Sequence, residues 1–534
     1  MHPRRVDMMQ HKSLHGMLGV LLTLVFGILA FEIIFLSMDG NSVKGPDITQ
    51  VITAVTKTSL NTSLKGSDAF YPDIIFHTDW SKYIKESDIL HQAALHQACV
   101  QYSTSVIPWT YGLAKENENW NRMQLINESD PEWLHKLRKC PDIDIFLPQG
   151  LRNFGYCEDA AAYAKFLESR MLPYWALDPR RINNNSITYH DLCPHTPVIF
   201  FNHYSDGLLD LPDWPASKPV YVMPNIEMYE LESENYWRAD VVLCKTALCA
   251  KYLKKWYKQE GNRRGTKVFY SRHTTSNVAL VAKRRLLLSE NETRSEKNFS
   301  NVSFVHTVGS SASKGTTQVL DCWLSQSFLP RLDVYISQDY YNDGYKAKYE
   351  QRIKKSSNIF IHTGRLEPAT FGQLLTEAAY YMCPSRHEGY GHYINQARSS
   401  RALIVTTDVA PMNELITSTS GVLFKAKKKP LQSQFLSGIS NKKHALRGVE
   451  GYYADFTSSD VCKAMAKVLN TTIDQRIERA DKALQQYYFD TVFFAHKMKE
   501  LRMIARSHSS YSSHNQLRSG HIEANVKIPE VEKN

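Results

Sequence analysis

The sequence is poor in several features that mark specialised classes of protein. Its nine cysteines are spread widely and irregularly over 534 residues, which excludes a disulfide-built scaffold and gives no zinc-binding pattern. With 43% apolar and 22% charged residues the composition is that of a globular protein, not of collagen, a coiled coil or a disordered chain. No internal repeat and no RNA- or DNA-binding motif accompanies the net charge of +10, so we expect no nucleic-acid partner.

Long hydrophobic runs are also scarce: one segment, residues 16–38, is long and apolar enough to cross a membrane, although Glu32 interrupts it. The segment before it, 1–15, carries three basic residues against one acidic residue, which predicts a cytoplasmic tail and a lumenal body. The sequence therefore predicts a single-pass type II membrane protein with a signal-anchor at 16–38 and a polar stem at 39–66. A cleaved signal peptide is the competing interpretation.

Seven N-x-S/T glycosylation sequons all follow the predicted anchor, and so do all nine cysteines, which permit at most four disulfides in an oxidising lumen. The sequons begin at Asn61, Asn127, Asn184, Asn291, Asn298, Asn301 and Asn470.

The body alternates short apolar runs with helical stretches, which predicts an α/β fold. We expect a first lobe over 67–283, an exposed linker over 284–301 and a second, doubly wound lobe over 302–472. In the first lobe the predicted strands are 143–147, 198–201, 220–223, 241–244 and 268–270, and a helix is predicted over 158–170. In the second lobe the predicted strands are 303–306, 332–336, 359–362, 380–383, 402–406 and 422–424.

Three segments beyond the predicted sheets complete the chain. The basic stretch 425–429 favours a solvated loop over a phosphate site. An apolar stripe with helical spacing predicts a helix over 473–505. The Ser- and charge-rich residues 506–534 are predicted to be disordered.

The most informative segment is CPSRHEGYGHYINQA, residues 383–397, which follows a predicted strand and begins a predicted helix. Gly389 and Gly391 allow the backbone to approach a ligand closely, and free N–H groups at a helix start favour an anion such as a diphosphate. Glu388 offers a carboxylate to sugar hydroxyl groups. A tight strand–helix turn explains the Gly-Tyr-Gly sequence alone equally well.

Taken whole, this segment resembles the signature of GT-B glycosyltransferases of the group 1 or family 4 type. Glu388-Gly389-Tyr390-Gly391 matches the family's first Glu and its glycines, and Ala397 matches the small residue that closes the motif. Gln396 stands where the family has a second Glu. The resemblance implies two Rossmann-like doubly wound lobes behind the transmembrane helix, with the last helix packing back on the first lobe.

A second stretch, residues 308–315, resembles the family's first loop of the second lobe. There, a basic residue after Gly309 and a lysine before the next glycine bind the donor diphosphate, and Lys314 matches that lysine. Ser310 or Ser311 stands where the first basic residue is usual. Arg365 and Arg386 are alternative sources of the missing cation.

The resemblance also implies roles for individual residues. Glu388 would bind hydroxyl groups of the donor sugar, the backbone around Tyr390 and Gly391 would hold the sugar and phosphates, and Gln396 would contact the ribose. The donor would be a UDP- or GDP-linked sugar, and the family needs no cofactor and no metal.

Two polar segments of the first lobe also follow predicted strands. His203 is a candidate near the reacting centre, against the alternative of a loop histidine with a structural role. Asn225 and Glu227 could contact an acceptor or cap a helix. Asp142 and Asp144 have the D-x-D spacing of a metal site, but they flank a predicted strand, which favours a structural role.

These observations and the resemblance lead to a membrane-anchored glycosyltransferase, an EC 2.4 enzyme that moves a sugar from a nucleotide donor to a lumenal glycan or glycoprotein. The resemblance implies retention of configuration. It also favours the Golgi membrane, because a short tail, a single anchor and a stem are typical of the resembled Golgi enzymes, with the endoplasmic reticulum as the alternative. The alternative is a degenerate GT-B protein that binds sugar or nucleotide without turnover. A glycoside hydrolase ranks last, because Glu388 is the one convincing site carboxylate where such enzymes need two.

Overall fold

The computed structural model describes residues 47–60, 70–113, 118–182, 186–228, 231–288, 297–430 and 443–523. The predicted tail (1–15) and anchor (16–38) lie outside the described residues. Among the helices that are described, none combines the length and the apolar character of a membrane span. Helix α2 (Ile48–Leu60) lies within the segment predicted as a stem. Residues 54–534 form one compact unit, and both sheets of the protein belong to it.

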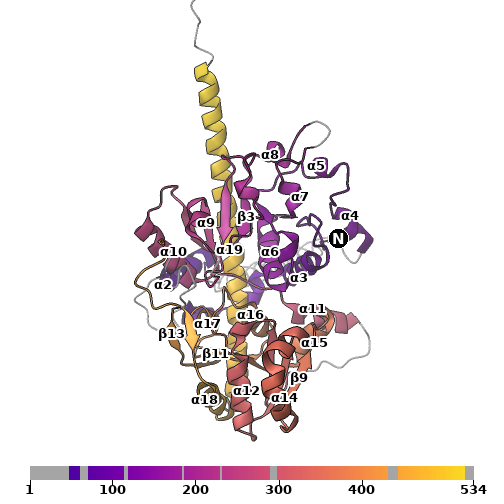
Figure 1. Ribbon diagram of the computed structural model, residues 1–534, viewed down its shortest axis with the longest axis vertical. Coiled ribbons are helices and arrows are strands. Elements are labelled where there is room, and N and C mark those ends of the chain that lie inside the picture. The colour runs from indigo at the N-terminus through magenta and orange to yellow at the C-terminus, as the bar shows by residue number, and fades with distance from the viewer. Residues whose placement is uncertain are drawn as a thin grey trace, which may run out of the picture. The chain divides into compact units, whose positions relative to one another are not determined.

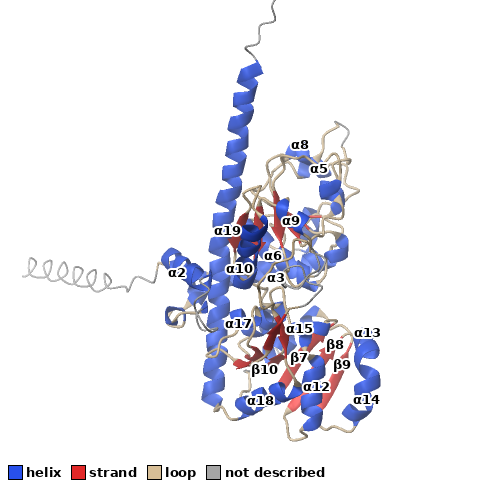
Figure 2. Cartoon of the chain, turned by 60° about the vertical axis from the view of Figure 1, so that its left-hand side comes forward, coloured by secondary structure: helices blue, strands red, loops and turns tan. Residues whose placement is uncertain are grey.

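The first lobe is built on a parallel six-stranded sheet in the order β2-β1-β3-β4-β5-β6. Its inner strands are almost continuously apolar and buried, as expected where helices cover both faces of a parallel sheet. The strands are β1 (Asp144–Phe146), β2 (Met171–Leu172), β3 (Val198–Phe201), β4 (Val220–Met223), β5 (Val241–Cys244) and β6 (Lys267–Tyr270). The helices are α3 (Glu86–Gln101), α4 (Glu118–Gln124), α5 (Trp133–Lys136), α6 (Phe154–Leu167), α7 (Tyr174–Leu177), α8 (Tyr189–Leu192), α9 (Ser233–Trp237), α10 (Ala247–Glu260) and α11 (Val278–Leu288). Figures 1 and 2 both label α3, α6 and α8 in this lobe.

The second lobe repeats this plan with a parallel sheet in the order β12-β11-β10-β7-β8-β9. Its strands are β7 (Ser303–Gly309), β8 (Arg331–Ile336), β9 (Ile359–Thr363), β10 (Tyr380–Cys383), β11 (Leu403–Thr407) and β12 (Val422–Phe424). Its helices are α12 (Thr316–Ser325), α13 (Gln338–Tyr341), α14 (Ala347–Lys354), α15 (Pro368–Glu377), α16 (His392–Ser399), α17 (Met412–Leu415) and α18 (Ser458–Leu469). The two sheets confirm the predicted α/β fold with two lobes.

The sheet order places β7 and β10 side by side at the centre of the second lobe. Because both strands run parallel, the loops that follow them emerge at the same edge of the sheet. Those loops carry the two sequence motifs described above. The fold therefore brings residues 308–315 and 383–391 together although they are far apart in the chain.

Two local predictions differ from the structure. Part of the basic stretch is not a loop: β13 (Lys427–Lys429) pairs antiparallel with β14 (Tyr453–Asp455), and its lysines are exposed. Backbone pairing stabilises this edge, while the lysine side chains remain solvated. The final helix, α19 (Ile473–Glu523), is longer than predicted and extends into the segment expected to be disordered; residues 524–534 lie outside the described residues.

Four disulfides join Cys99 to Cys157, Cys140 to Cys193, Cys244 to Cys249 and Cys322 to Cys462. This is the largest number that nine cysteines allow, and the remaining Cys383 is buried. Three of the bridges lie in the first lobe and one in the second. Each lobe is thus crosslinked internally.

Helix α19 belongs to both lobes, as expected. Ala480 is part of the apolar core of the second lobe, whereas Phe494, Met498 and Leu501 are part of the core of the first. Figure 1 shows the helix running alongside both lobes.

A buried polar network holds this helix between the lobes. Asp490 of α19 accepts hydrogen bonds from Arg272 Nε (2.5 Å), which follows β6, and from Arg398 Nη2 (2.7 Å), which lies on α16. Tyr71 donates to the same carboxylate at 2.6 Å, and burial raises the pKa of Tyr71 to about 12, so it stays a donor. Both arginines are almost fully buried, and the single negative charge of Asp490 balances one of their two positive charges.

We expect Asp490→Asn to lower the free energy of unfolding by about 3–5 kcal/mol, because it leaves two buried arginines without a carboxylate. Asp481→Asn is the matched control: Asp481, on the same helix, pairs with Arg401 at a partly exposed site, so the loss there should be about 0–1 kcal/mol. Urea denaturation of the two variants measures the difference. Equal losses would show that the buried network does not hold α19 in place.

Candidate functional site

The motif loop 384–391 joins the buried strand β10 to helix α16. Gly391 directly precedes the helix and has a φ of +105°, a backbone conformation that favours glycine. The first backbone N–H groups of a helix have no partner within it, and Gly391 has no side chain to cap those of α16. The Tyr390 side chain is 3% exposed and its hydroxyl donates to the carbonyl of His273 in the first lobe at 2.6 Å. Tyr390 therefore joins the two lobes through its side chain, while its backbone belongs to the loop.

The loop after β7 brings Lys314 to Glu388. Lys314 Nζ lies 2.5 Å from Glu388 Oε1 and 3.5 Å from the centre of the Tyr393 ring. Ser385 Oγ donates to the same carboxylate oxygen. Two residues that the sequence singled out for donor binding are thus in direct contact at the carboxyl ends of β7 and β10.

Gly315 explains how the lysine comes so close. Its φ is +63°, and a Cβ at this position would lie 2.4 Å from the carbonyl oxygen of Pro384. Only a glycine lets the start of α12 approach the motif loop at this distance. Gly309, the other glycine of this stretch, ends β7, and its carbonyl accepts the N–H of Ser337 at 2.9 Å.

Arg386 does not take the place of the first basic residue that the resembled family has after its glycine, because its guanidinium group has other partners. The Arg386 guanidinium donates to the hydroxyl of Tyr453 and lies 5.4 Å from the centre of the Phe456 ring. Its backbone N–H donates to the carbonyl of Ser313 at 2.7 Å, so Arg386 fixes the loop that carries Lys314.

From the first lobe, the loop after β4 faces Gly389. A Cβ on Gly389 would lie 2.4 Å from Asn225 Oδ1 and 2.6 Å from Glu227 Oε1, so a glycine is needed for this contact between lobes. Burial, helped by the nearby charges of Glu388 and Asp159, raises the pKa of Glu227 to about 7, while Lys245 opposes the shift.

The sequence-predicted His203 lies in the neighbouring loop, directly after β3. Its ring packs against Tyr204 with 4.0 Å between ring centres. Asn202 beside it accepts the N–H of Asn225, which ties the loops after β3 and β4 together. Among the described contacts of His203 none reaches Glu388, and its catalytic role stays a prediction.

A buried charged cluster lies behind these loops. Lys245 Nζ donates to both oxygens of Asp159 at 2.9 Å. His392 Nε2 also binds Asp159 Oδ1, at 3.0 Å, and His273 Nε2 lies 2.9 Å from it. Burial disfavours the charged form of Asp159, but Lys245 and His392 hold its pKa well below the ordinary value.

Asp159, His273 and His392 also have the composition and closeness of metal ligands, with ligand atoms within 4.8 Å of one another. Lys245 already binds both carboxylate oxygens and supplies the positive charge that a metal ion would bring. Burial lowers the pKa of His273 to about 4, so it adds no further charge. We therefore interpret the cluster as an ion pair with its hydrogen-bonding partners.

Gln396 also joins the two lobes. Its amide donates to Glu158 Oε1 of α6 at 3.0 Å, and Ser276 donates to the same carboxylate through both its N–H and its hydroxyl. Glu158 is 1% exposed. A glutamate at 396 would bring a second carboxylate to this buried site, which explains the amide where the resembled family has an acid. Ribose binding by Gln396 stays a prediction.

The D-x-D pair has the structural role expected of it. Asp142 binds Arg502 and Arg506 of α19, and Asp144 binds Arg170. Both carboxylates are thus neutralised by arginines within the first lobe.

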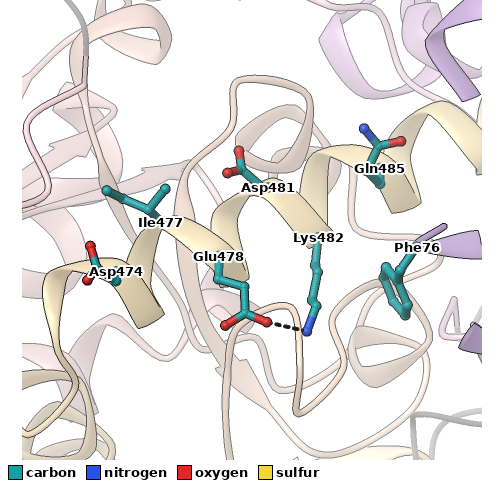
Figure 3. Close-up of a pocket in the computed structure, with 7 residues that line it drawn as sticks. All are labelled: Phe76, Asp474, Ile477, Glu478, Asp481, Lys482 and Gln485. Atoms are coloured by element: carbon teal, nitrogen blue, oxygen red, sulfur yellow. Dashed lines mark hydrogen bonds and ion pairs between the residues drawn. The ribbon is translucent and has the colours of Figure 1, made fainter. Parts of the chain in front are cut away.

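A surface pocket of about 370 Å³ lies elsewhere, beside the start of α19 (Figure 3). Its charged side chains include the Glu478–Lys482 pair, whose polar atoms are 2.7 Å apart. None of the candidate site residues that the sequence predicted lines this pocket.

We expect Gln396→Glu to lower the free energy of unfolding by roughly 1–3 kcal/mol, because it removes the donor to Glu158 and adds a like charge. The loss should shrink at acidic pH, where one of the two carboxylates takes up a proton. Thermal and urea denaturation at pH 5 and pH 8 measure both effects.

The exchanged double variant, Glu158→Gln with Gln396→Glu, restores one amide and one acid and should recover most of the stability. Failure of the double variant to recover it would contradict the direct pairing of these two residues.

No protein-family model and no curated protein sequence matches the chain. Among solved structures it is similar to the trehalose-6-phosphate synthase of Burkholderia multivorans, with a TM-score of 0.43 and 11% identity over 72% of this chain and 80% of that chain. It is also similar to the sucrose-phosphate synthase of Thermosynechococcus elongatus, with a TM-score of 0.41 and 11% identity over 64% and 84% of the two chains. The HepE protein of Anabaena, solved in complex with UDP, gives a TM-score of 0.38 and 16% identity over 57% and 78%. At this level of similarity, the function has to be inferred from the chain's own residues.

Proposed function

We propose that the protein is a glycosyltransferase that moves a sugar from a nucleotide-sugar donor to a hydroxyl group of an acceptor. The observation that carries the proposal is the meeting of Lys314 and Glu388 at the carboxyl ends of two adjacent parallel strands, β7 and β10. This is the edge at which doubly wound sheets bind ligands. The same place offers a cation for a diphosphate, a carboxylate for sugar hydroxyls and the free N–H groups at the start of α16.

Each group has a chemical task in this proposal. Lys314 leaves its ion pair with Glu388 and neutralises the charge that grows on the departing diphosphate. The N–H groups at the start of α16, after Gly391, bind the phosphates. Glu388, released from the lysine, accepts hydrogen bonds from the donor sugar. No step in this scheme requires a metal ion or another cofactor. Retention of configuration follows from the resemblance.

The contacts between the lobes imply a conformational step. The side chains of Tyr390, His392 and Gln396 bind groups of the first lobe directly. Some of these contacts have to part to admit a donor and an acceptor, and they re-form when the lobes close. Closure excludes water, which would otherwise hydrolyse the donor.

We further propose that this enzyme acts on a glycan or glycoprotein in the Golgi lumen, anchored as a single-pass type II protein by residues 16–38; the endoplasmic reticulum is the alternative. The proposal is supported by the apolar run, by the position of every sequon after it, and by four disulfides, which persist in oxidising compartments.

A binding protein without turnover is the second candidate. Two observations favour it: Gln396 is engaged with Glu158, and serines stand where a first basic residue would complete the diphosphate clamp. Release of nucleotide from a nucleotide-sugar distinguishes the two candidates, because a protein that only binds the donor releases none.

We expect Lys314→Ala to weaken binding of the nucleoside diphosphate by about tenfold to a hundredfold, since a hydrogen bond to a charged group contributes about 1.5–3 kcal/mol. Lys348→Ala is the matched control, because Lys348 is exposed and pairs with Asp321 away from the motif loop. Titration calorimetry on the full-length chain in detergent measures the affinity. Equal affinities of the two variants would place the diphosphate elsewhere.

We expect Glu388→Gln to lower nucleotide release from the donor by at least tenfold while nucleoside diphosphate binding changes little, because the carboxylate contacts the sugar and not the nucleotide. A coupled assay for released nucleotide measures the turnover. Nucleotide release by the wild type with none of the UDP- and GDP-sugars would favour the binding protein. Unchanged turnover in the variant would contradict the role of Glu388.

A further inference from the structure

The first-lobe loops that face the motif loop offer hydrogen-bond acceptors. Asn225 Oδ1 and Glu227 Oε1 are the atoms that approach Gly389. Asn225 Oδ1 is buried and has no hydrogen-bond partner among the described residues. Amide and carboxylate oxygens accept hydrogen bonds, and a carbohydrate donates them through its hydroxyl groups.

The same edge of the first sheet has no cation to spare. The described residues that follow β3 and β4 directly, 202–210 and 224–228, include no lysine or arginine. The basic residues that follow β1, β5 and β6 are engaged within the protein. Arg152, after β1, donates to three backbone carbonyls; Lys245, after β5, binds Asp159; and Arg272, after β6, binds Asp490.

A phosphorylated acceptor would meet an unfavourable surface here. Phosphate groups are bound by arginines, lysines and clusters of N–H donors. A phosphate beside Glu227 and Glu388 would face two carboxyl groups at the loops that meet across Gly389, and their charges repel an anion.

We propose that the acceptor is an uncharged carbohydrate and that Glu227 binds the hydroxyl group that receives the sugar. This inference rests on the proposed glycosyl transfer. In that reaction the hydroxyl oxygen bonds to the anomeric carbon of the donor sugar as the bond from that carbon to the phosphate oxygen breaks. The hydroxyl proton passes to the leaving diphosphate, and Glu227 orients the hydroxyl group by accepting its hydrogen bond until the transfer.

The surroundings of Glu227 predict how this contact depends on pH. Its charged neighbours are Glu388 from the loop after β10, Asp159 from α6 and Lys245 after β5. Its negative charge helps to raise the pKa of the nearby phenol groups of Tyr156, Tyr236 and Tyr452. Because its pKa is raised to about 7, Glu227 becomes a full hydrogen-bond acceptor only above that pH. Acceptor-dependent turnover should therefore rise through neutral pH.

The experiment measures nucleotide release by the full-length chain in detergent, first with UDP- and GDP-sugars alone and then with acceptor probes. The probes are a panel of neutral mono- and oligosaccharides, and glucose 6-phosphate and mannose 6-phosphate. The variants are Glu227→Gln and the matched control Asp213→Asn, an exposed acid in the loop that precedes β4. Thermal unfolding of each variant establishes that it is folded.

We expect at least one neutral sugar to stimulate nucleotide release and the sugar phosphates to have no effect. Glu227→Gln should lower kcat/KM for that acceptor by at least tenfold and abolish the rise through pH 7. Asp213→Asn should behave like the wild type.

Stimulation by the sugar phosphates, or by none of the neutral sugars, overturns the inference about the acceptor. A normal kcat/KM and pH profile in Glu227→Gln overturns the role of this residue. Absence of nucleotide release from every donor, both alone and with every acceptor probe, is a different result, because it contradicts the proposed glycosyl transfer itself.

Discussion

The arrangement of the two lobes depends on the buried carboxylate of Asp490. It binds one arginine from each lobe, Arg272 and Arg398, and it lies on the helix that contributes apolar side chains to both cores. Charges so fully buried are stable only when they are paired, so this network specifies one position of α19 against each lobe. In the proposed opening of the lobes, this network stays intact while the contacts around the motif loop part.

Around the motif loop, the contacts between the lobes include hydrogen bonds from three side chains of the second lobe. Tyr390 donates to a backbone carbonyl, His392 binds Asp159, and Gln396 donates to Glu158. Such contacts exchange readily for water or for ligand hydroxyls, unlike the apolar core along α19. Gln396 stands where the resembled family has a glutamate, and its partner gives a physical reason: its amide donates a hydrogen bond to the carboxylate of Glu158 in the first lobe.

The sequence allowed much of this fold to be predicted. Runs such as Val220–Met223 and Tyr380–Cys383 are buried strands whose bounds follow from continuous apolar character between breaks. Lys314 was found through the resemblance of residues 308–315 to a glycosyltransferase loop, and Glu388 through the glycine-containing segment 383–397 and its resemblance to the same family. The strand Met171–Leu172 was missed because two residues give no periodicity. Asp159 and Asp490 were missed because an acid within a helix has the pattern of a solvated face, and only tertiary packing reveals its buried partners.

The measurement that tests the central claim most directly is a thermal-shift screen of the full-length protein in detergent against UDP, GDP, ADP and CMP. A nucleotide that binds the native state raises the unfolding midpoint by mass action. We predict a selective shift with UDP or GDP that is clearly smaller in Lys314→Ala at the same nucleotide concentration. No shift with any nucleotide, or a shift that the lysine does not affect, would contradict a donor site built on Lys314 and Glu388.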